Sequence, residues 1–262
     1  MFWQTFAPQA LLIKFGPIQI YWYGLFLALA VLSAFLLIRF LLKRKNLGLT
    51  NDEVGDIVFF TIICGLMGAR LWHILFYNFS YFLENPLEIF QVWHGGLAIS
   101  GGVVGGLLFL IIYSRLKNKN FFNLLDLLIV TLPFAQAIGR MGNYFNQELF
   151  GPSCNYVWCI FISISNRPFE MQNFSLFHPV FFYELILDLI LGIYLLIIYL
   201  KPKPSAVGKI FWLYILGYAI IRFITEFFRL DSATLFWGLK WMQFFSVFLV
   251  ILAVFQLRSK RS

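Results

Sequence analysis

The sequence predicts an all-α polytopic membrane protein with about seven transmembrane helices. Hydrophobic residues make up 61% of the chain and charged residues only 12%, and the mean hydropathy is +0.81. A soluble domain is closer to half apolar and about a quarter charged. Long apolar stretches recur along the chain, and clusters of Lys and Arg follow every second one. The composition, the length of the apolar stretches and the placement of the basic clusters therefore all predict a polytopic membrane protein.

Seven segments are apolar enough to cross a bilayer, which takes about 20 residues of helix. They are 19–42, 54–77, 97–115, 122–140, 179–200, 207–229 and 236–257. The fourth contains Pro133, Gln136 and Gly139, which neighbouring helices can accommodate. Residues 1–13 carry no Lys or Arg ahead of an apolar stretch, so we expect the first long apolar run to be retained. We expect residues 1–262 to form a single membrane domain, with an extracytoplasmic segment at 141–178.

The basic residues predict the orientation of the chain in the membrane. They cluster after the first, third and fifth spans and at the end of the chain: Lys43, Arg44, Lys45; Arg115, Lys117, Lys119; Lys201, Lys203, Lys209; and Arg258, Lys260, Arg261. Cytoplasmic loops carry an excess of Lys and Arg, so the N-terminus is expected outside and the C-terminus inside. The net charge of +8 is then explained by topology and by contact with anionic membrane lipids, without a nucleic-acid partner.

Several charged residues fall in the outer portions of the predicted spans: Arg70, Arg140, Glu184, Arg222, Glu226 and Arg229. The inner halves contain few, since Arg39 and Asp126 lie near the ends of their spans and Asp188 lies deeper. A charge at mid-helix costs roughly 2.5 kcal/mol or more on insertion, so it needs a partner, a cavity or a substrate. Arg222, Glu226 and Arg229 have the spacing of one helix face. One interpretation is a structural ladder of ion pairs. The other, which we favour, is that four arginines against two glutamates bind a phosphate, which suits guanidinium geometry.

The stretch 139–151, GRMGNYFNQELFG, is unusually polar for the outer end of a span. It places Asn143, Asn146, Gln147 and Glu148 close to Arg140. We interpret it as a functional loop, because loops at the end of a rigid scaffold commonly carry binding residues.

The three cysteines, Cys64, Cys154 and Cys159, have no metal-ligand spacing. Cys154 and Cys159 could pair in an oxidising compartment, but we expect two unpaired, small apolar side chains instead.

Over nearly its whole length the chain resembles prolipoprotein diacylglyceryl transferases, a family of bacterial plasma-membrane enzymes. The matching motifs, in order, are Tyr23-Gly24-Leu25, Gly68-Ala69-Arg70, Trp93-His94-Gly95-Gly96, Gly139-Arg140-Met141-Gly142-Asn143 with Asn146, Glu148 and Gly151, then His178-Pro179, Tyr183-Glu184, Tyr218, and Arg222 with Glu226-Phe227-Phe228-Arg229. The stretch around Arg140 is the most specific of these.

The resemblance implies transfer of the diacylglyceryl group of phosphatidylglycerol to the lipobox cysteine thiol in the signal peptide of a prolipoprotein, with release of glycerol phosphate. This is the first step of lipoprotein maturation in the bacterial inner membrane, and it requires no cofactor and no metal. Arg140 corresponds to the family's phosphatidylglycerol-binding arginine and Arg222 to an essential one. Asn143, Glu148, Gly151 and Arg229 correspond to functionally sensitive positions, and Tyr23 is expected in the same cavity. Arg70 and Glu226 complete the predicted binding set.

The sequence departs from the family at two places. Many members carry a histidine, proposed as the base, where this chain has Ser100. A serine cannot take a proton at neutral pH without help, so His94 and Glu148 are the candidates for the base. A third hypothesis is that the arginine-rich field alone lowers the pKa of the incoming thiol. The family's usual glutamine is replaced by Phe181.

Two other functions are compatible with buried membrane charges. A transporter or a lipid-binding protein for an anionic substrate would also carry them. A transporter predicts repeats or interrupted helices near the midplane, whereas these charges gather on one side. Another transferase with a different acceptor is the second alternative, and the order of the motifs argues against it.

Overall fold

The structure, a computed structural model, describes residues 2–16, 18–45, 48–202, 206–230, 234–236 and 238–259. The side chains of Ile18, His94 and residues 234–236 lie outside this description, as do Lys203, Lys260 and Arg261 of the predicted basic clusters. The chain divides into two compact units. The first comprises residues 1–37 and 128–262, and the second comprises residues 38–127.

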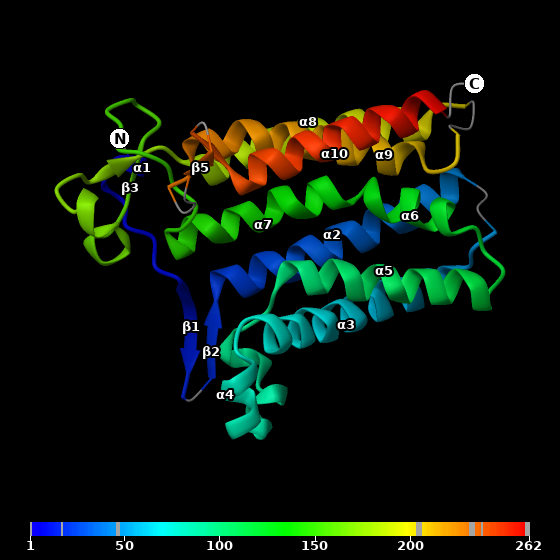
Figure 1. Cartoon of the computed structure of the whole chain (residues 1–262), viewed down its shortest axis with the longest axis horizontal. Coiled ribbons are helices and arrows are strands. Elements are labelled where there is room, and N and C mark those ends of the chain that lie inside the picture. Colours follow the sequence, from blue (N-terminus) through cyan, green and yellow to red (C-terminus); the bar gives the residue numbers. More distant parts are fainter. Residues whose placement is uncertain are drawn as a thin grey trace. The chain divides into compact units, whose positions relative to one another are not determined.

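The second unit is built on two long helices that pack side by side (Figure 1), α3 (Asn51–Phe76) and α5 (Ile99–Leu116). Between them lie the short helix α4 (Phe79–Glu84) and the 3₁₀ turns η1 (Pro86–Phe90) and η2 (Val92–His94). Thr50 begins α3 with a capping box, since its hydroxyl accepts from the amide of Glu53 and the Glu53 carboxylate accepts from the amide of Thr50. This reciprocal cap fixes the start of the helix.

The first unit holds the bundle formed by α7, α8, α9 and α10. Its helices are α1 (Phe2–Thr5), α7 (Leu132–Asn146), α8 (Val180–Leu200), α9 (Lys209–Thr225) and α10 (Trp241–Ser259), with the 3₁₀ turns η3 (Ile164–Asn166), η4 (Phe169–Met171) and η5 (Glu226–Phe228). Three two-stranded antiparallel sheets pair β1 (Leu11–Phe15) with β2 (Ile18–Tyr21), β3 (Ile160–Phe161) with β4 (Leu176–Phe177), and β5 (Thr234–Phe236) with β6 (Leu239–Lys240). In Figure 1, α8, α9 and α10 run alongside one another.

Two helices cross the division between the units. Helix α2 (Trp22–Arg44) begins in the first unit and ends in the second, and α6 (Phe121–Ile129) ends where the first unit resumes.

The predicted class, an all-α polytopic membrane protein, is confirmed. In the described residues six helices are long and apolar enough to cross a membrane, and a seventh crossing results if α6 and α7 are counted as one bent span. The observed helices begin and end within a few residues of the predicted segments. The largest shifts are at the fourth span, which ends at Asn146 rather than 140, and at the last, which starts at Trp241 rather than 236.

The fourth predicted span is not one helix. It is bent by 40° at a break between α6 and α7, at Val130 and Thr131. Pro133 falls in the first turn of α7, where its missing amide proton is not needed. After the break α7 continues to Asn146, six residues beyond the predicted end. The polar stretch that was expected to form a loop from Arg140 onward is therefore helical up to Asn146.

Glycines bring α3 and α5 into backbone contact. A Cβ added to Gly68 would collide with the carbonyl oxygen of Gly101 and lie 3.0 Å from the Cα of Gly105. A Cβ on Gly101 would in turn collide with the carbonyl oxygen of Gly68. Membrane helices that approach this closely use small residues at the interface.

We therefore expect Gly68→Ala to destabilise the protein by about 1–3 kcal/mol, the usual cost of overpacking. Gly55→Ala is the matched control on the same helix, because a Cβ there meets nothing within 4 Å. It should be neutral or stabilise the helix by about 0.5–1 kcal/mol. Thermal unfolding of the two purified variants in detergent measures the difference. Equal midpoints would show that α3 and α5 do not need this contact.

Candidate functional site

The charged residues of the first unit converge on one buried carboxylate. Glu184, in the second turn of α8, forms ion pairs with Arg140 of α7 (2.6 Å), Arg229 (3.4 Å) and Arg222 of α9 (3.6 Å). Arg222 also pairs with Glu226 at 2.9 Å. The side chains of Glu184 and Glu226 are 3% and 0% exposed. The ion pairs thus join three arginines to two glutamates, and Asp188, one turn beyond Glu184 on α8, is also buried.

The cluster is not saturated by these ion pairs. The Nε atoms of Arg140 and Arg222 are buried and have no hydrogen-bond partner within the described part of the chain. A buried donor left without an acceptor costs free energy, so such atoms call for an additional acceptor. Arg140 keeps 20% of its side chain exposed and Arg222 keeps 15%. The arrangement can therefore accept an anion in addition to the two glutamates.

The predicted helix face of Arg222, Glu226 and Arg229 is only partly correct. Helix α9 ends at Thr225, Glu226 begins the 3₁₀ turn η5, and Arg229 lies beyond it in extended conformation. The tighter turn changes the direction of Arg229, yet its guanidinium still reaches Glu184. Convergence on a carboxylate of α8, rather than a shared α-helical face, is what brings these residues together.

Lys240 joins this region and was not identified from the sequence. It is buried, and its Nζ donates to the carbonyl oxygens of Glu226, at 2.9 Å, and Arg229. A cation at carbonyl groups that end a helical segment is electrostatically favourable. The available signal was a lysine inside the last predicted span, which is as anomalous there as the arginines are elsewhere.

The polar residues of α7 form a second group one turn from Arg140. The side-chain amides of Asn143 and Asn146 both donate to Oε1 of Glu148, at 2.8 and 3.1 Å. Gln147 ends α7 in the left-handed conformation, with φ of 52°, and so turns Glu148 back toward the helix. Arg140 and Asn143 are three residues apart and share a helix face.

A cavity of about 440 Å³ lies beside Glu148. Its lining includes Asn146 and Glu148 at one side and Leu230, the residue after Arg229, at another. The cavity therefore lies beside the group formed by Asn146 and Glu148.

Tyr23 and Gly151 have packing roles near these groups. Tyr23, in the first turn of α2, packs on Gly142 of α7, where an added Cβ would lie 2.6 Å from its ring. Gly151 donates its amide to the carbonyl of His178 at 2.8 Å. A Cβ on Gly151 would lie 2.6 Å from the carbonyl oxygen of Phe228. A larger residue at Gly142 would push α7 away from Tyr23, and one at Gly151 would displace the turn that precedes Arg229.

Arg70 belongs to the second unit, where it is buried and fully engaged with backbone. Its guanidinium donates to the carbonyl oxygens of Glu88, Ile89, Gly95 and Gly96. These bonds hold the turns η1 and η2 against α3, and η2 contains the backbone of His94. The side chain of His94 lies outside the described structure, so its predicted role stays a prediction.

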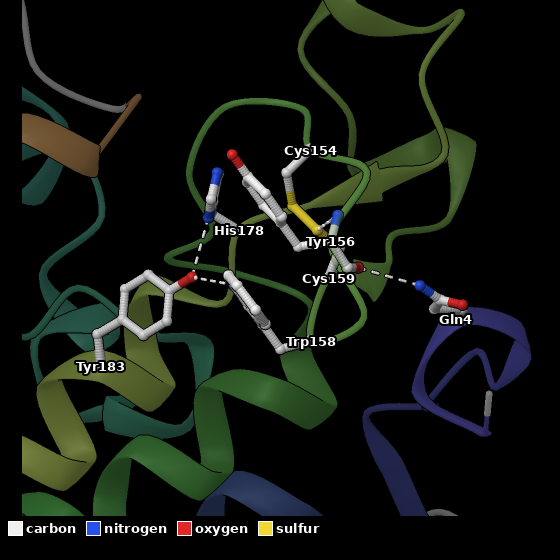
Figure 2. The surroundings of a disulfide bond; sticks show 7 residues. All are labelled: Gln4, Cys154, Tyr156, Trp158, Cys159, His178 and Tyr183. Atoms are coloured by element: carbon white, nitrogen blue, oxygen red, sulfur yellow. Dashed lines mark hydrogen bonds between the residues drawn. A yellow bond between two sulfur atoms is a disulfide. The ribbon is translucent and has the colours of Figure 1, made fainter.

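The expectation of two unpaired cysteines is wrong, because Cys154 and Cys159 form a disulfide. Their Cα atoms are 6.1 Å apart across a short turn, which is within reach of a disulfide. Figure 2 shows the loop that it closes, with Trp158 donating from its indole nitrogen to the hydroxyl of Tyr183 at 3.0 Å. That hydroxyl also lies 2.9 Å from Nδ1 of His178.

Together these features define a polytopic helical membrane protein with a buried, arginine-rich ionic cluster at one end of its helices. The family model of prolipoprotein diacylglyceryl transferase matches residues 10–258. The chain belongs to this family of transferases.

Curated relatives of the same description cover most of the chain. The phosphatidylglycerol–prolipoprotein diacylglyceryl transferase of Trichormus variabilis is 37% identical over 87% of this chain and 82% of its own. That of Synechocystis sp. is 34% identical over 96% and 89%, and that of Thermotoga maritima is 35% identical over 95% and 85%. The resemblance identified from the ordered motifs is thus confirmed.

Proposed function

We propose that this chain transfers the diacylglyceryl group of phosphatidylglycerol to a cysteine thiol of a prolipoprotein, the reaction that its relatives' names describe. The observation that carries the proposal is the convergence of three arginines on buried Glu184, with the buried Nε donors of Arg140 and Arg222 unpaired within the described residues. A phosphate diester is the anion that such a set of guanidinium groups suits best.

The reaction needs what this cluster offers. The cysteine sulfur attacks a glycerol carbon of the lipid, the carbon–oxygen bond to phosphate breaks, and glycerol phosphate leaves with the bonding electron pair. Negative charge grows on the leaving phosphate as that bond breaks. Arginines that are already oriented by Glu184 and Glu226 stabilise this charge without reorganising. In this proposal Arg140 and Arg222 hold the phosphate, and Arg229 completes the cluster.

An apolar cavity gives the lipid a second point of contact. It measures about 310 Å³ and lies between α8 and α9. Its lining runs from Leu187 to Tyr194 on α8 and from Leu213 to Ile221 on α9. The cavity therefore lies along the two helices that carry Glu184 and Arg222. We propose this cavity for one acyl chain of the donor lipid.

The thiol proton must go to a base, because a free thiol with a pKa near 8.5 is mostly protonated at neutral pH. Glu148 is our proposal for this role, since its carboxylate is oriented by Asn143 and Asn146 one turn from Arg140. His94 is the competing candidate. Arg70, which was predicted to bind substrate, is better explained as a positioning residue for the turn that carries His94.

Two variants separate the two bases. If Glu148 takes the proton, Glu148→Gln lowers kcat by about 10²–10⁴ with little change in KM for the lipid, and His94→Ala retains most of the activity. If His94 is the base, the two results are reversed. Activity that persists in both variants would favour a thiol whose pKa is lowered by the arginine field alone. Assays at several pH values on both purified proteins provide the readout.

We further propose an N-out, C-in orientation in a bacterial plasma membrane, with the arginine cluster on the outer side and residues 1–262 acting as one membrane domain. The basic clusters after alternate spans support this orientation. The acceptor would be the lipobox cysteine of a prolipoprotein signal peptide, and membrane lipids would surround the helices.

The experiment that tests the proposal uses the full chain in detergent, phosphatidylglycerol and a synthetic prolipoprotein peptide. Release of glycerol phosphate that depends on the peptide cysteine is the expected result. A peptide with serine in place of cysteine is the control, because its hydroxyl is a far poorer nucleophile. Tight binding of phosphatidylglycerol by the folded protein without any release would contradict a transferase and favour lipid binding or transport.

A further inference from the structure

Asp188 is a buried carboxylate that the ion pairs of the candidate site leave out. It lies on α8, four residues beyond Glu184, so the two acidic side chains share one face of the helix. Asp188 is 1% exposed, and neither of its carboxylate oxygens has a hydrogen-bond partner within the described part of the chain. A buried carboxylate without such partners is costly, and the reaction proposed above gives it no role.

The charge of Asp188 nonetheless acts on the arginine cluster. It interacts electrostatically with Arg140, which attracts it, and with Glu184, which repels it. Tyr214 of α9 also interacts with Asp188, but its hydroxyl donates to Oε1 of Gln136 on α7, at 3.1 Å. Asp188 therefore adds a negative charge to the region of the cluster without the ion pairs that hold Glu184 in place.

This arrangement of Asp188 does not serve folding. A buried ion pair needs close contact between its partners, and a buried charge without such contacts destabilises the folded state. Asp188→Asn should therefore have a thermal midpoint equal to or above that of wild type in lipid-free detergent. A lower midpoint would make Asp188 a structural residue and would overturn the inference drawn from it below.

The proposed reaction changes the charge that the arginines have to hold. The donor lipid carries a phosphate diester with a single negative charge. The product, glycerol phosphate, is a monoester with about 1.5–2 negative charges at neutral pH. Arginines therefore attract the product more strongly than the substrate, and a site that only attracted anions would release this product slowly. A third buried carboxylate beside the arginines opposes that attraction.

We propose that Asp188 is a counter-charge that weakens the hold of the arginine cluster on glycerol phosphate and so speeds release of this product. The inference rests on the proposed function, which makes glycerol phosphate the leaving group at the cluster. Asp188 acts through its charge, from one turn further along α8 than Glu184, and touches neither substrate nor product. Because a Coulomb energy is proportional to the charge of the ligand, Asp188 should oppose the product nearly twice as strongly as the substrate.

The test compares full-length Asp188→Asn with wild type in detergent, with phosphatidylglycerol and a cysteine peptide as substrates. Formation of the lipidated peptide is followed while glycerol phosphate is added as an inhibitor. We expect KM for phosphatidylglycerol to fall about threefold in the variant, and the inhibition constant of glycerol phosphate to fall by up to about the square of that factor, roughly tenfold. Thermal midpoints with each ligand alone measure the same changes in binding without turnover.

Two further variants serve as controls. Asp188→Glu retains the charge, and its inhibition constant for glycerol phosphate should stay within about threefold of the wild-type value. Asp56→Asn makes the same substitution, with the same change in net charge, at an exposed aspartate of the second unit. It should leave KM and the inhibition constant unchanged.

Three kinetic results would also overturn the inference. Equal inhibition of Asp188→Asn and wild type would show that Asp188 contributes no charge to the site. Weaker inhibition of the variant would show that Asp188 organises the arginines for anion binding. Equal changes in KM and in the inhibition constant would indicate a change of shape, because an effect of charge depends on the charge of the ligand. All three leave the transferase function standing, whereas a wild type that forms no lipidated peptide would contradict that function itself.

Discussion

Arg140→Ala should lower kcat for glycerol phosphate release by about 10²–10³, the usual loss when one oriented donor to a developing anion is removed. Arg140 pairs with Glu184 at 2.6 Å, and its Nε remains unpaired, so it is both oriented and still able to donate. Arg258→Ala is the control, because Arg258 is an exposed arginine of α10. Its activity should match wild type.

Removal of Arg140 also removes a partner from a buried carboxylate, so a folding defect has to be separated from a catalytic one. Arg140→Lys retains the charge near Glu184 but loses the planar, forked donor geometry. We expect it to fold with a thermal midpoint near that of wild type and still lose at least about tenfold in kcat. A folded Arg140→Lys or Arg140→Ala variant with wild-type kcat would exclude this arginine from the phosphate site.

The spans could be predicted from the sequence because the bilayer imposes a simple rule. Every backbone polar group must be bonded within the hydrocarbon layer, so long apolar runs have to be helices. The contact of α3 and α5 at Gly68 and Gly101 obeys a second simple rule, because membrane helices that pack closely have small residues at the interface. Both rules depend on local sequence alone.

The features that the sequence did not predict depend on tertiary structure. The 3₁₀ turn after Thr225 has no proline or glycine at the point of change. The break at Val130 and Thr131, in contrast, lies just before Pro133, whose ring and missing amide proton do not allow a helix to continue from Ile129. The Cys154–Cys159 disulfide depends on a turn whose geometry cannot be deduced from two cysteines five residues apart. Lys240 became part of the charged region only through its bonds to the carbonyls of Glu226 and Arg229.

The sequence predicted most of the charged residues that belong to the candidate site, but it did not predict how they pair with one another. Arg140, Arg222, Glu226 and Arg229 were anomalous because charges in a span are costly, and the structure brings them together. That Glu184 is the shared partner of three arginines could not be predicted, since they approach it from different segments. Arg70 was anomalous for the same reason, but its guanidinium is bonded to backbone carbonyls of its own unit.

The second large effect concerns Glu184, and it distinguishes a structural ladder of ion pairs from an anion site. Glu184→Gln keeps the shape of the side chain and removes the one negative charge that all three arginines share. Removing one partner of a buried ion pair typically costs about 3–5 kcal/mol, because the other charges stay buried without compensation. We expect a loss of this size in lipid-free detergent, measured as a lower thermal midpoint. Glu170→Gln, at an exposed glutamate of the same unit, is the control.

The response to lipid then decides the role of the cluster. A ligand that binds only the folded state raises the midpoint according to its concentration and affinity. If the arginines bind a lipid phosphate, anionic phosphatidylglycerol should raise the midpoint of Glu184→Gln more than that of wild type, because it replaces the missing negative charge. Zwitterionic phosphatidylcholine should raise both midpoints equally. If phosphatidylglycerol also raised both equally, the cluster would be a structural ladder of ion pairs. The phosphate would then have to be bound elsewhere, with the cavity beside Glu148 as the next place to test.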